Sequence, residues 1–233
     1  MQTLIRILSL MLCALSWAPV IAQPCLSNKP LPYCRTFFIT ELGYSYKATS
    51  PLHRNSYTAI NDTIAFSTTN PISGRHLLHS ELGLMRNFNA NFAVGASHFL
   101  AWDVGHNFHG GFKLRVRKWF NEKMSLDLSG GPLLWGAEGE YAYPGFVGGA
   151  SLNFSDWESV NVTVTQMKTK GYDYTFDASY EGRRYRNYSP AEDELAIYLG
   201  YKFSSKPGLA LNATALASFA FVVGLFLSTV RFD

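Results

Sequence analysis

The sequence predicts an all-β protein, an antiparallel up-and-down barrel of eight strands, which is followed by one hydrophobic α-helix. Three observations support this fold class. Segments of about ten residues alternate apolar with polar or small side chains, and such period-two alternation is typical of strands. The connections between these segments are alternately short and long. A continuous apolar run then replaces the alternation near the C-terminus.

The segment DELAIYLGYKF shows the alternation most clearly, because one face is wholly apolar or aromatic while the other is small or polar. The eight predicted strands span residues 36–47, 75–88, 92–102, 110–120, 123–135, 144–155, 158–168 and 193–204. Tight turns lie at 87–91, 121–123 and 155–157, intermediate connections at 103–109 and 136–143, and long ones at 48–74 and 169–192. Short turns at one end and longer loops at the other are typical of membrane barrels.

The first 22 residues have the features of a secretory signal peptide. Arg6 precedes the apolar run Ile7 to Trp17, and Val20-Ile21-Ala22 offers a small-residue cleavage site. An N-terminal membrane anchor is the alternative, but the apolar run is short for a membrane span. We therefore expect an exported protein.

Residues 23–35 form a predicted N-terminal segment that contains a cysteine pair. Cys25 and Cys34 are the thiols left after the signal peptide, and in an exported protein they indicate a disulfide. Removing Arg6 lowers the formal net charge from +3 to +2. A charge this small does not indicate a nucleic-acid partner.

The two faces of the predicted strands favour a membrane barrel over 36–204. In the strand at 110–120, apolar Phe112 and Leu114 alternate with Lys113 and Arg115. A soluble barrel would place its apolar face inward, whereas a membrane barrel has a polar lumen and aromatic girdles. The girdle candidates are Tyr44, Tyr46, Trp102, Trp119, Trp135, Phe154 and Trp157.

A charge network is predicted inside the barrel. An eight-stranded barrel has an interior just wide enough for side chains, and opposite charges there offset much of their desolvation. The predicted members are Glu41, Glu81, Lys113, Arg115, Arg117, Asp127 and Lys202. We expect a structural ion-pair core without an open pore. The alternative is a narrow gated channel whose lining charges select ions.

The end of the last predicted strand resembles the closing strand of bacterial outer-membrane β-barrels. Gly200, Tyr201 and Phe203 match the aromatic ending that the barrel assembly machinery reads. The chain resembles the small eight-stranded OmpA-like and OmpX-like barrels over about residues 36 to 203. This resemblance implies location in the bacterial outer membrane and contact with its lipids and lipopolysaccharide. It also implies a structural or surface-interaction role.

The long connection at 169–192 is a candidate binding surface for an extracellular protein or glycan. Tyr and Arg dominate recognition surfaces, because they offer large contact areas at a low entropic cost. The candidates are Tyr172, Tyr174, Tyr180, Arg183, Arg184, Tyr185, Arg186 and Tyr188. The alternative is that the flanks of this connection extend the neighbouring strands. The arginines could also hold lipopolysaccharide phosphates.

We expect neither catalysis nor a cofactor or metal. His79-Ser80-Glu81 and Ser97-His98 suggest a lipid-modifying hydrolase, but adjacent strand residues point to opposite faces. His106 and His109, near Asp103, could bind a metal, but they fall in a predicted surface loop. A lipid hydrolase or acyltransferase therefore stays the alternative function.

Residues 205–233 are predicted to form a linker and a hydrophobic helix. Pro207 and Gly208 end the alternation, and Leu209 to Val230 is long enough to span a membrane. This tail departs from most outer-membrane barrels and resembles tails of Bacteroidota-type barrels. We expect the helix to pack on the outside of the barrel through its small residues, Ala210, Ala213, Ala217 and Gly224.

Overall fold

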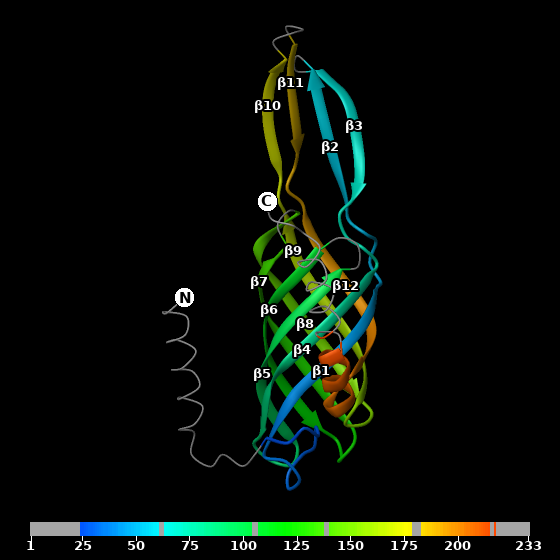
Figure 1. Ribbon diagram of the computed structural model, residues 1–233, viewed down its shortest axis with the longest axis vertical. Coiled ribbons are helices and arrows are strands. Elements are labelled where there is room, and N and C mark those ends of the chain that lie inside the picture. Colours follow the sequence, from blue (N-terminus) through cyan, green and yellow to red (C-terminus); the bar gives the residue numbers. More distant parts are fainter. Residues whose placement is uncertain are drawn as a thin grey trace, which may run out of the picture.

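The computed structural model describes residues 24–60, 63–103, 107–137, 140–178, 183–214 and 217. The predicted signal peptide lies outside these residues. The described chain forms a closed barrel, a second sheet beyond one end of it and a short helix beside its wall (Figure 1).

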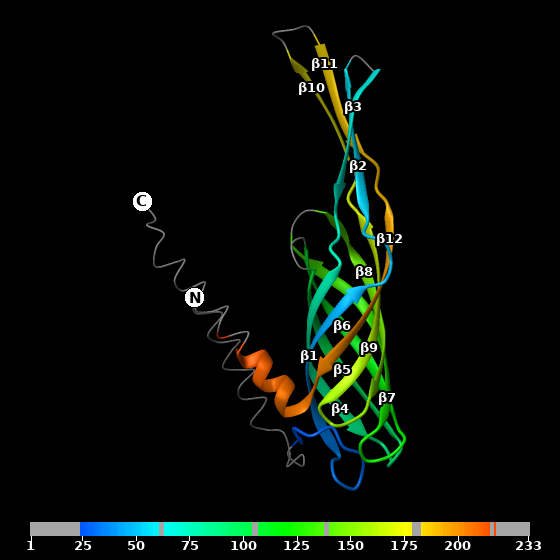
Figure 2. The same cartoon turned by 90° about the vertical axis from the view of Figure 1, so that its right-hand side faces the viewer.

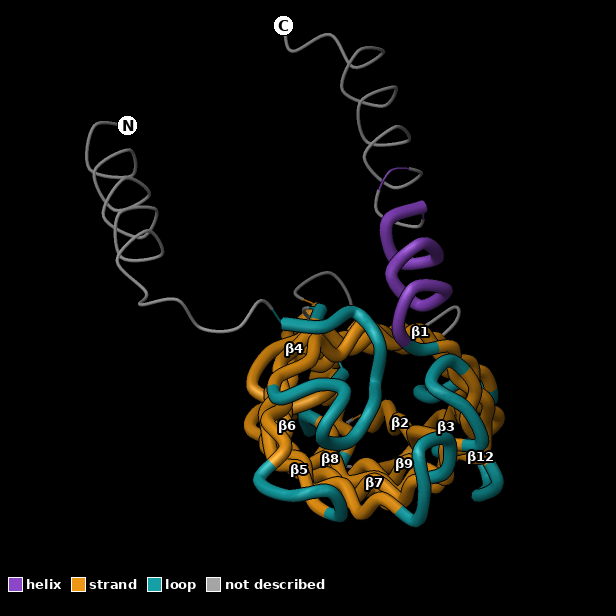
Figure 3. The backbone as a smooth tube through the Cα atoms, turned by 90° about the horizontal axis from the view of Figure 1, so that it is seen from below, coloured by secondary structure: helices purple, strands orange, loops and turns teal. Residues whose placement is uncertain are grey.

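Eight antiparallel strands close the barrel in the order β1-β12-β9-β8-β7-β6-β5-β4, which confirms the predicted fold class. Each strand begins and ends within three residues of its predicted bounds. The strands are β1 (Thr36–Lys47), β4 (His76–Asn87), β5 (Phe92–Asp103), β6 (Asn107–Trp119), β7 (Ser125–Gly136), β8 (Tyr141–Asn153), β9 (Glu158–Thr169) and β12 (Asp193–Phe203). Seen end-on, they form a ring with the helix outside it (Figure 3).

The two long connections form a sheet of their own. The hairpin within 169–192 matches the alternative in which the flanks of this connection extend the neighbouring strands, whereas the hairpin within 48–74 was not predicted. The sheet contains β2 (His53–Ile60), β3 (Thr63–Pro71), β10 (Tyr172–Ala178) and β11 (Arg183–Ser189), in the order β10-β11-β2-β3. Each connection is a hairpin, and β11 pairs with β2 to join them. This projecting sheet continues the long axis of the barrel beyond its rim (Figures 1 and 2).

Charged and apolar side chains form layers inside the barrel. The charged layer is enclosed by two buried apolar clusters, one toward each end. The cluster near the N-terminal end comprises Phe37, Ile39, Met85, Ala93 and Trp119. The cluster toward the projecting sheet includes Phe99, Leu133, Val147, Met167 and Tyr198. Trp119 was predicted to lie in an outward girdle, but it points inward and donates a 2.8 Å hydrogen bond to Asn87 Oδ1.

The outer face of the barrel wall is apolar. Leu114 on β6 is 74% exposed, and Leu128 on β7 and Leu199 on β12 are each 53% exposed. Aromatic side chains lie at both ends of this outer face, with Trp102 and Trp135 toward the projecting sheet and Trp157 in the turn at the opposite end. The barrel therefore has a charged layer between apolar clusters inside and an apolar outer face.

The seam between β1 and β12 leaves part of β1 beyond the end of its neighbour. Pairing begins at Leu42 with Phe203, so residues 36–41 extend past β12. Cys25 covers the start of this overhang: its N–H donates to Thr36 O at 2.8 Å, and its carbonyl accepts from Phe38 N–H at 2.9 Å. The predicted disulfide between Cys25 and Cys34 is confirmed, and it closes the segment that supplies this cover.

A helix over residues 205–214 covers the rest of the overhang. Thr40 Oγ1 donates to Ser205 O at 2.7 Å. Gly208 lies so close to β1 that a Cβ atom there would be 2.0 Å from Thr40 O. The helix begins before the predicted Leu209, because Pro207 falls in its first turn, where the missing N–H needs no partner.

The helix contacts the wall through Gly208 and Asn212, which lie one turn apart, and not through the predicted alanines. Ala210, Ala213 and Ala217 are exposed. Gly224 and the remaining predicted helix lie outside the described residues. In the described part of the chain, no helix is both long and apolar enough to cross a membrane.

Replacing Gly208 with Val should detach the first turns of this helix, because the new side chain would overlap the β1 backbone. We expect a loss of about 1–3 kcal/mol in the free energy of unfolding, measured by urea titration in lipid vesicles. The control is Ala210→Val, an exposed position, which should cost only about 0.5 kcal/mol through helix propensity. Equal losses would contradict the close contact.

Candidate functional site

The barrel interior holds a charge cluster centred on Arg115. This side chain projects inward from β6 and binds three carboxylates on three other strands. Its guanidinium donates to Glu41 at 2.9 and 3.0 Å, to Asp127 at 2.7 and 3.3 Å and to Glu81 at 3.3 Å. Arg115 thereby ties β1, β4 and β7 together across the lumen.

Three further cations complete the cluster. Arg117 donates to Asp127 at 2.7 Å, Lys113 to Glu81 at 2.8 Å, and Lys202 to Glu41 at 2.7 Å. The structure places all seven predicted lumen charges here, and each is at most 3% exposed. Buried charges are costly unless they are paired and hydrogen-bonded, and these contacts supply both conditions.

A second buried network lies at the mouth of the barrel and was not predicted. Lys47 Nζ at the end of β1 binds Glu194 Oε1 and donates to Ser73 Oγ at 2.6 Å. Tyr141 donates to the other oxygen of Glu194 at 2.5 Å. The alternation of side chains along a strand could have predicted two residues of this network. Lys47 lies on the same face of its strand as Glu41, and Glu194 lies on the same face of its strand as Lys202.

This network holds a piece of the β3–β4 connection inside the mouth. Ile72 is 4% exposed within the apolar cluster of the lumen, and its carbonyl accepts from Asn107 Nδ2 at 3.1 Å. Gly74 N–H donates to Asp103 Oδ2 at 2.7 Å. Residues 72–74 therefore form a mouth plug that fills the lumen between the barrel strands and the projecting sheet.

The histidine considered as a metal ligand does not lie in a surface loop. His109 belongs to β6, is 8% exposed and shares a 2.8 Å hydrogen bond with Tyr143 Oη. The prediction was wrong because β6 begins at Asn107, three residues before its predicted start. His106 lies outside the described residues. No cluster of three or more metal-binding side chains occurs within the described ranges.

The two serine and histidine pairs are divided between the faces of the wall. Ser97 points inward and donates to Glu81 Oε2 at 3.0 Å, whereas His98 points outward and stacks on Trp135 at 5.3 Å. His79 is buried, but the adjacent Ser80 lies on the outer face and donates to Asn212 at 2.6 Å. Neither pair forms a nucleophile and its base.

One face of the projecting sheet carries a lateral row of polar and aromatic side chains. Thr58 donates to Asn187 Oδ1 at 2.7 Å, and Asn187 Nδ2 donates to Tyr174 Oη at 3.1 Å. Tyr172 donates to Ser56 Oγ at 2.9 Å. These contacts link β10, β11 and β2 on a surface that stays accessible, because Tyr174 is 54% exposed.

The opposite face carries Arg184 and Arg186. Arg186 donates to Asp173 at 2.6 and 2.9 Å, and this hydrogen bond lowers the pKa of the Asp173 carboxyl. The Arg186 guanidinium lies 5.4 Å from the ring of Tyr188, which stacks on Tyr57 at 5.1 Å. The projecting sheet thus has two chemically different faces.

The other predicted binding residues vary in placement. Arg184 is exposed, Tyr185 is half-buried, and Arg183 begins β11. Tyr180 lies outside the described residues. The structure therefore brings the described candidates onto β10 and β11, but it distributes them over both faces of the sheet.

The predicted assembly signal ends the last barrel strand. Tyr201 and Phe203 point outward and their rings meet edge-on at 5.2 Å. Gly200 faces inward, where a Cβ atom would lie 2.1 Å from Ser45 Oγ and 2.3 Å from Tyr44 O. A larger residue at this position would therefore disturb the β1–β12 seam.

The fold defines a small closed β-barrel with a filled lumen and a projecting sheet. No protein-family model matches the chain, and neither a curated protein nor a solved structure matches it. Inferences about function therefore rest on the geometry of the chain itself.

Replacing Arg115 with Met should strongly destabilise the barrel, because three buried carboxylates would lose their shared partner. We expect a loss of about 3–5 kcal/mol in the free energy of unfolding, measured by urea titration. Leu114→Met, on the outer face of the same strand, should change it by less than about 1.5 kcal/mol. Comparable values for both variants would show that the ion pairs contribute little.

Proposed function

We propose that this chain is an exported bacterial outer-membrane protein of the small eight-stranded, OmpA-like or OmpX-like kind. In this proposal the barrel is a membrane anchor, and the projecting sheet binds a partner at the cell surface. The projecting sheet carries the proposal, because it places two exposed faces of different chemistry well beyond the barrel rim (Figure 2).

The distribution of side chains on the wall supports a membrane location. A barrel in water would need a polar outer face, but this one exposes at least one leucine, valine or phenylalanine on every barrel strand. Exposed aromatic side chains at both ends fit the interfacial girdles of membrane barrels. The disulfide fits an exported protein, because such bonds persist in oxidising compartments.

The lumen supports an anchoring role more than conduction. Arg115 and its carboxylates cross the interior, an apolar layer lies above them, and the mouth plug closes the end toward the projecting sheet. An ion would have to displace several buried, paired side chains to pass. We therefore propose a barrel without an open pore, and we propose no catalytic role.

The projecting sheet has the composition of a recognition surface. Tyr172 and Tyr174 present large rings with few rotatable bonds, so contact with them costs little conformational entropy. The lateral hydrogen bonds through Asn187 hold this face before any partner arrives. Extracellular proteins and glycans are the proposed partners, with lipopolysaccharide phosphates as contacts for the face that carries Arg184 and Arg186.

The proposed orientation of the wall predicts that a charge on the outer face will oppose insertion. Leu128→Arg should cost about 2–4 kcal/mol near the membrane midplane, measured as folding into lipid vesicles by heat-modifiable gel migration. The control places the same charge on the projecting sheet: Thr68→Arg, at an exposed position of β3, should fold like the natural chain. Equal folding of both variants would contradict a membrane barrel.

The proposed binding face predicts a selective effect of Tyr174→Ala. Lipid vesicles carrying the protein would be applied to arrays of glycans and extracellular proteins, and the variant should bind at least about tenfold more weakly than the natural chain. Tyr57→Ala changes the opposite face and serves as the control. If vesicles with the natural chain bind no better than lipid alone, the projecting sheet is not a binding surface for these partners.

A further inference from the structure

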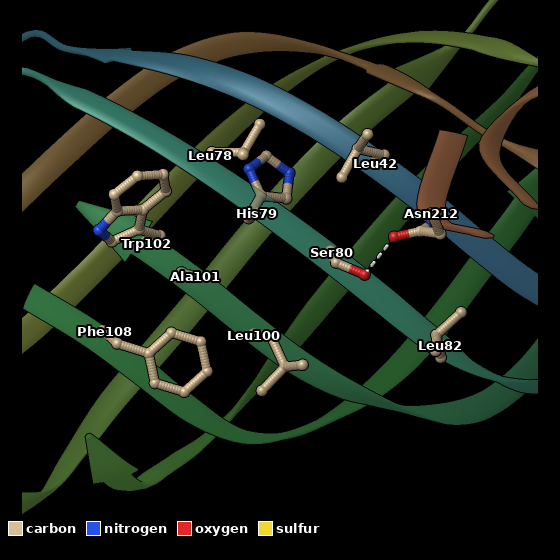
Figure 4. A pocket seen from close by; sticks show the side chains of 10 residues that line it. All are labelled: Leu42, Leu78, His79, Ser80, Leu82, Leu100, Ala101, Trp102, Phe108 and Asn212. Atoms are coloured by element: carbon tan, nitrogen blue, oxygen red, sulfur yellow. Dashed lines mark hydrogen bonds between the residues drawn. The ribbon is translucent and has the colours of Figure 1, made fainter. Parts of the chain in front are cut away.

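A groove runs along the outer wall of the barrel beside the helix (Figure 4). Its volume is about 460 Å³, which falls within the range of small-molecule sites. Six large apolar side chains line it: Leu42, Leu78, Leu82, Leu100, Trp102 and Phe108. They come from β1, β4, β5 and β6, while Asn212 of the helix closes one end.

Beyond its first residue, Ser205, the described part of the helix approaches the wall most closely at Gly208 and Asn212. Gly208 packs on Thr40, and Asn212 reaches Ser80. Leu209 and Leu211, which flank this contact face, remain 38% and 40% exposed. The helix slants away from the barrel as it leaves β12 (Figure 2), and the groove forms a wedge that Asn212 of the helix and residues of the wall line together.

The side chains of Ser80 and Asn212 at the closed end already have hydrogen-bond partners. Asn212 Oδ1 accepts from Ser80 Oγ at 2.6 Å, and Asn212 Nδ2 donates to Glu41 O at 3.1 Å and to Gly208 O at 2.9 Å. A polar ligand would have to break these bonds to reach the end of the groove. The groove therefore suits a hydrocarbon without polar groups.

We propose that this groove holds one acyl chain of a membrane lipid, an inference that rests on the proposed membrane location. The groove continues the apolar outer face of the wall, where lipid tails are the hydrocarbon at hand. The wedge cannot stay empty within a bilayer, because unfilled apolar surfaces lose their dispersion contacts.

The direction of the chain follows from the open end of the groove. Trp102 and Phe108 lie next to the β5–β6 connection, on the side of the projecting sheet, whereas Asn212 lies toward mid-barrel. The acyl chain therefore enters from the outer leaflet. Trp102 is 51% exposed there and lies near the headgroup level, where tryptophan is enriched.

The groove can be tested by counting bound lipids after extraction. The protein would be folded into dioleoylphosphatidylcholine vesicles, transferred to detergent and weighed by native mass spectrometry. The natural chain should keep one lipid. Leu100→Trp, which fills the groove, should keep none, and Leu114→Trp, an outward position outside the groove, should keep one.

A second measurement does not depend on how Leu100→Trp folds. The vesicles would contain lipid that is brominated on its acyl chain and quenches tryptophan. The emission of Trp102 would be obtained as the difference in fluorescence between the natural chain and Trp102→Phe. Quenching of this Trp102 signal should saturate at a low fraction of brominated lipid. A tryptophan introduced at Leu114 should be quenched in proportion to that fraction, as expected for bulk lipid.

Each alternative has its own result. Equal lipid counts in all three proteins would show that the groove binds lipid no better than the rest of the wall, and would overturn the proposal. Quenching of Trp102 in proportion to the fraction of brominated lipid would overturn it in the same way. A dimer mass abolished by Leu100→Trp would assign the groove to a second copy. A chain ending at Ala217 that gains a lipid missing from the natural chain would assign it to residues 218–233.

Heat-modifiable migration of the same samples separates this proposal from the one on which it rests. Failure of the natural chain to fold into vesicles would overturn both proposals. Folding without a retained lipid would overturn the groove alone and leave the membrane barrel in place.

Discussion

The pairing of Arg115 with three carboxylates is the interaction on which the architecture depends. A guanidinium buried with Glu41, Glu81 and Asp127 fixes the polar face of four strands inward. Since side chains alternate along a strand, the same choice turns the apolar face outward. The filled lumen and the apolar wall are thus two results of one arrangement.

The seam between β1 and β12 imposes the second constraint. A closed barrel has no edges, but a strand that extends past its neighbour exposes backbone donors and acceptors. Here Cys25 bonds to residues 36 and 38, and the helix begins against Thr40. The two covers also contact each other, because Asn28 N–H donates to Ser205 Oγ at 3.2 Å. The segments before and after the barrel therefore complete it.

The sequence was sufficient to predict the eight barrel strands, because apolar side chains alternate with polar or small ones at period two along most of their length. It did not predict β2 and β3, and it gave β10 and β11 only as an alternative for the connection at 169–192. These strands carry polar side chains on both faces, so their periodicity resembles that of a loop, and only the pairing of β11 with β2 unites them. The positions of the lumen charges could be predicted from the alternation of side chains along each strand alone.

The contacts of the helix were harder to predict. Small residues suggested an alanine face, but the face is set by where the helix leaves β12 and by the bond between Asn212 and Ser80, which are 132 residues apart. The mouth plug depends in the same way on distant partners, since Ser73 bonds to Lys47 and Glu194. Such long-range contacts leave no local pattern in a sequence.

The mouth plug also has a mechanical consequence. Ile72 and Ser73 directly follow β3, so a pull on β3 along the barrel axis would load the hydrogen bonds of Asn107, Lys47 and Glu194. These bonds lie inside the barrel and join several of its strands. Tension on β3 would thereby be shared among β1, β6 and β12.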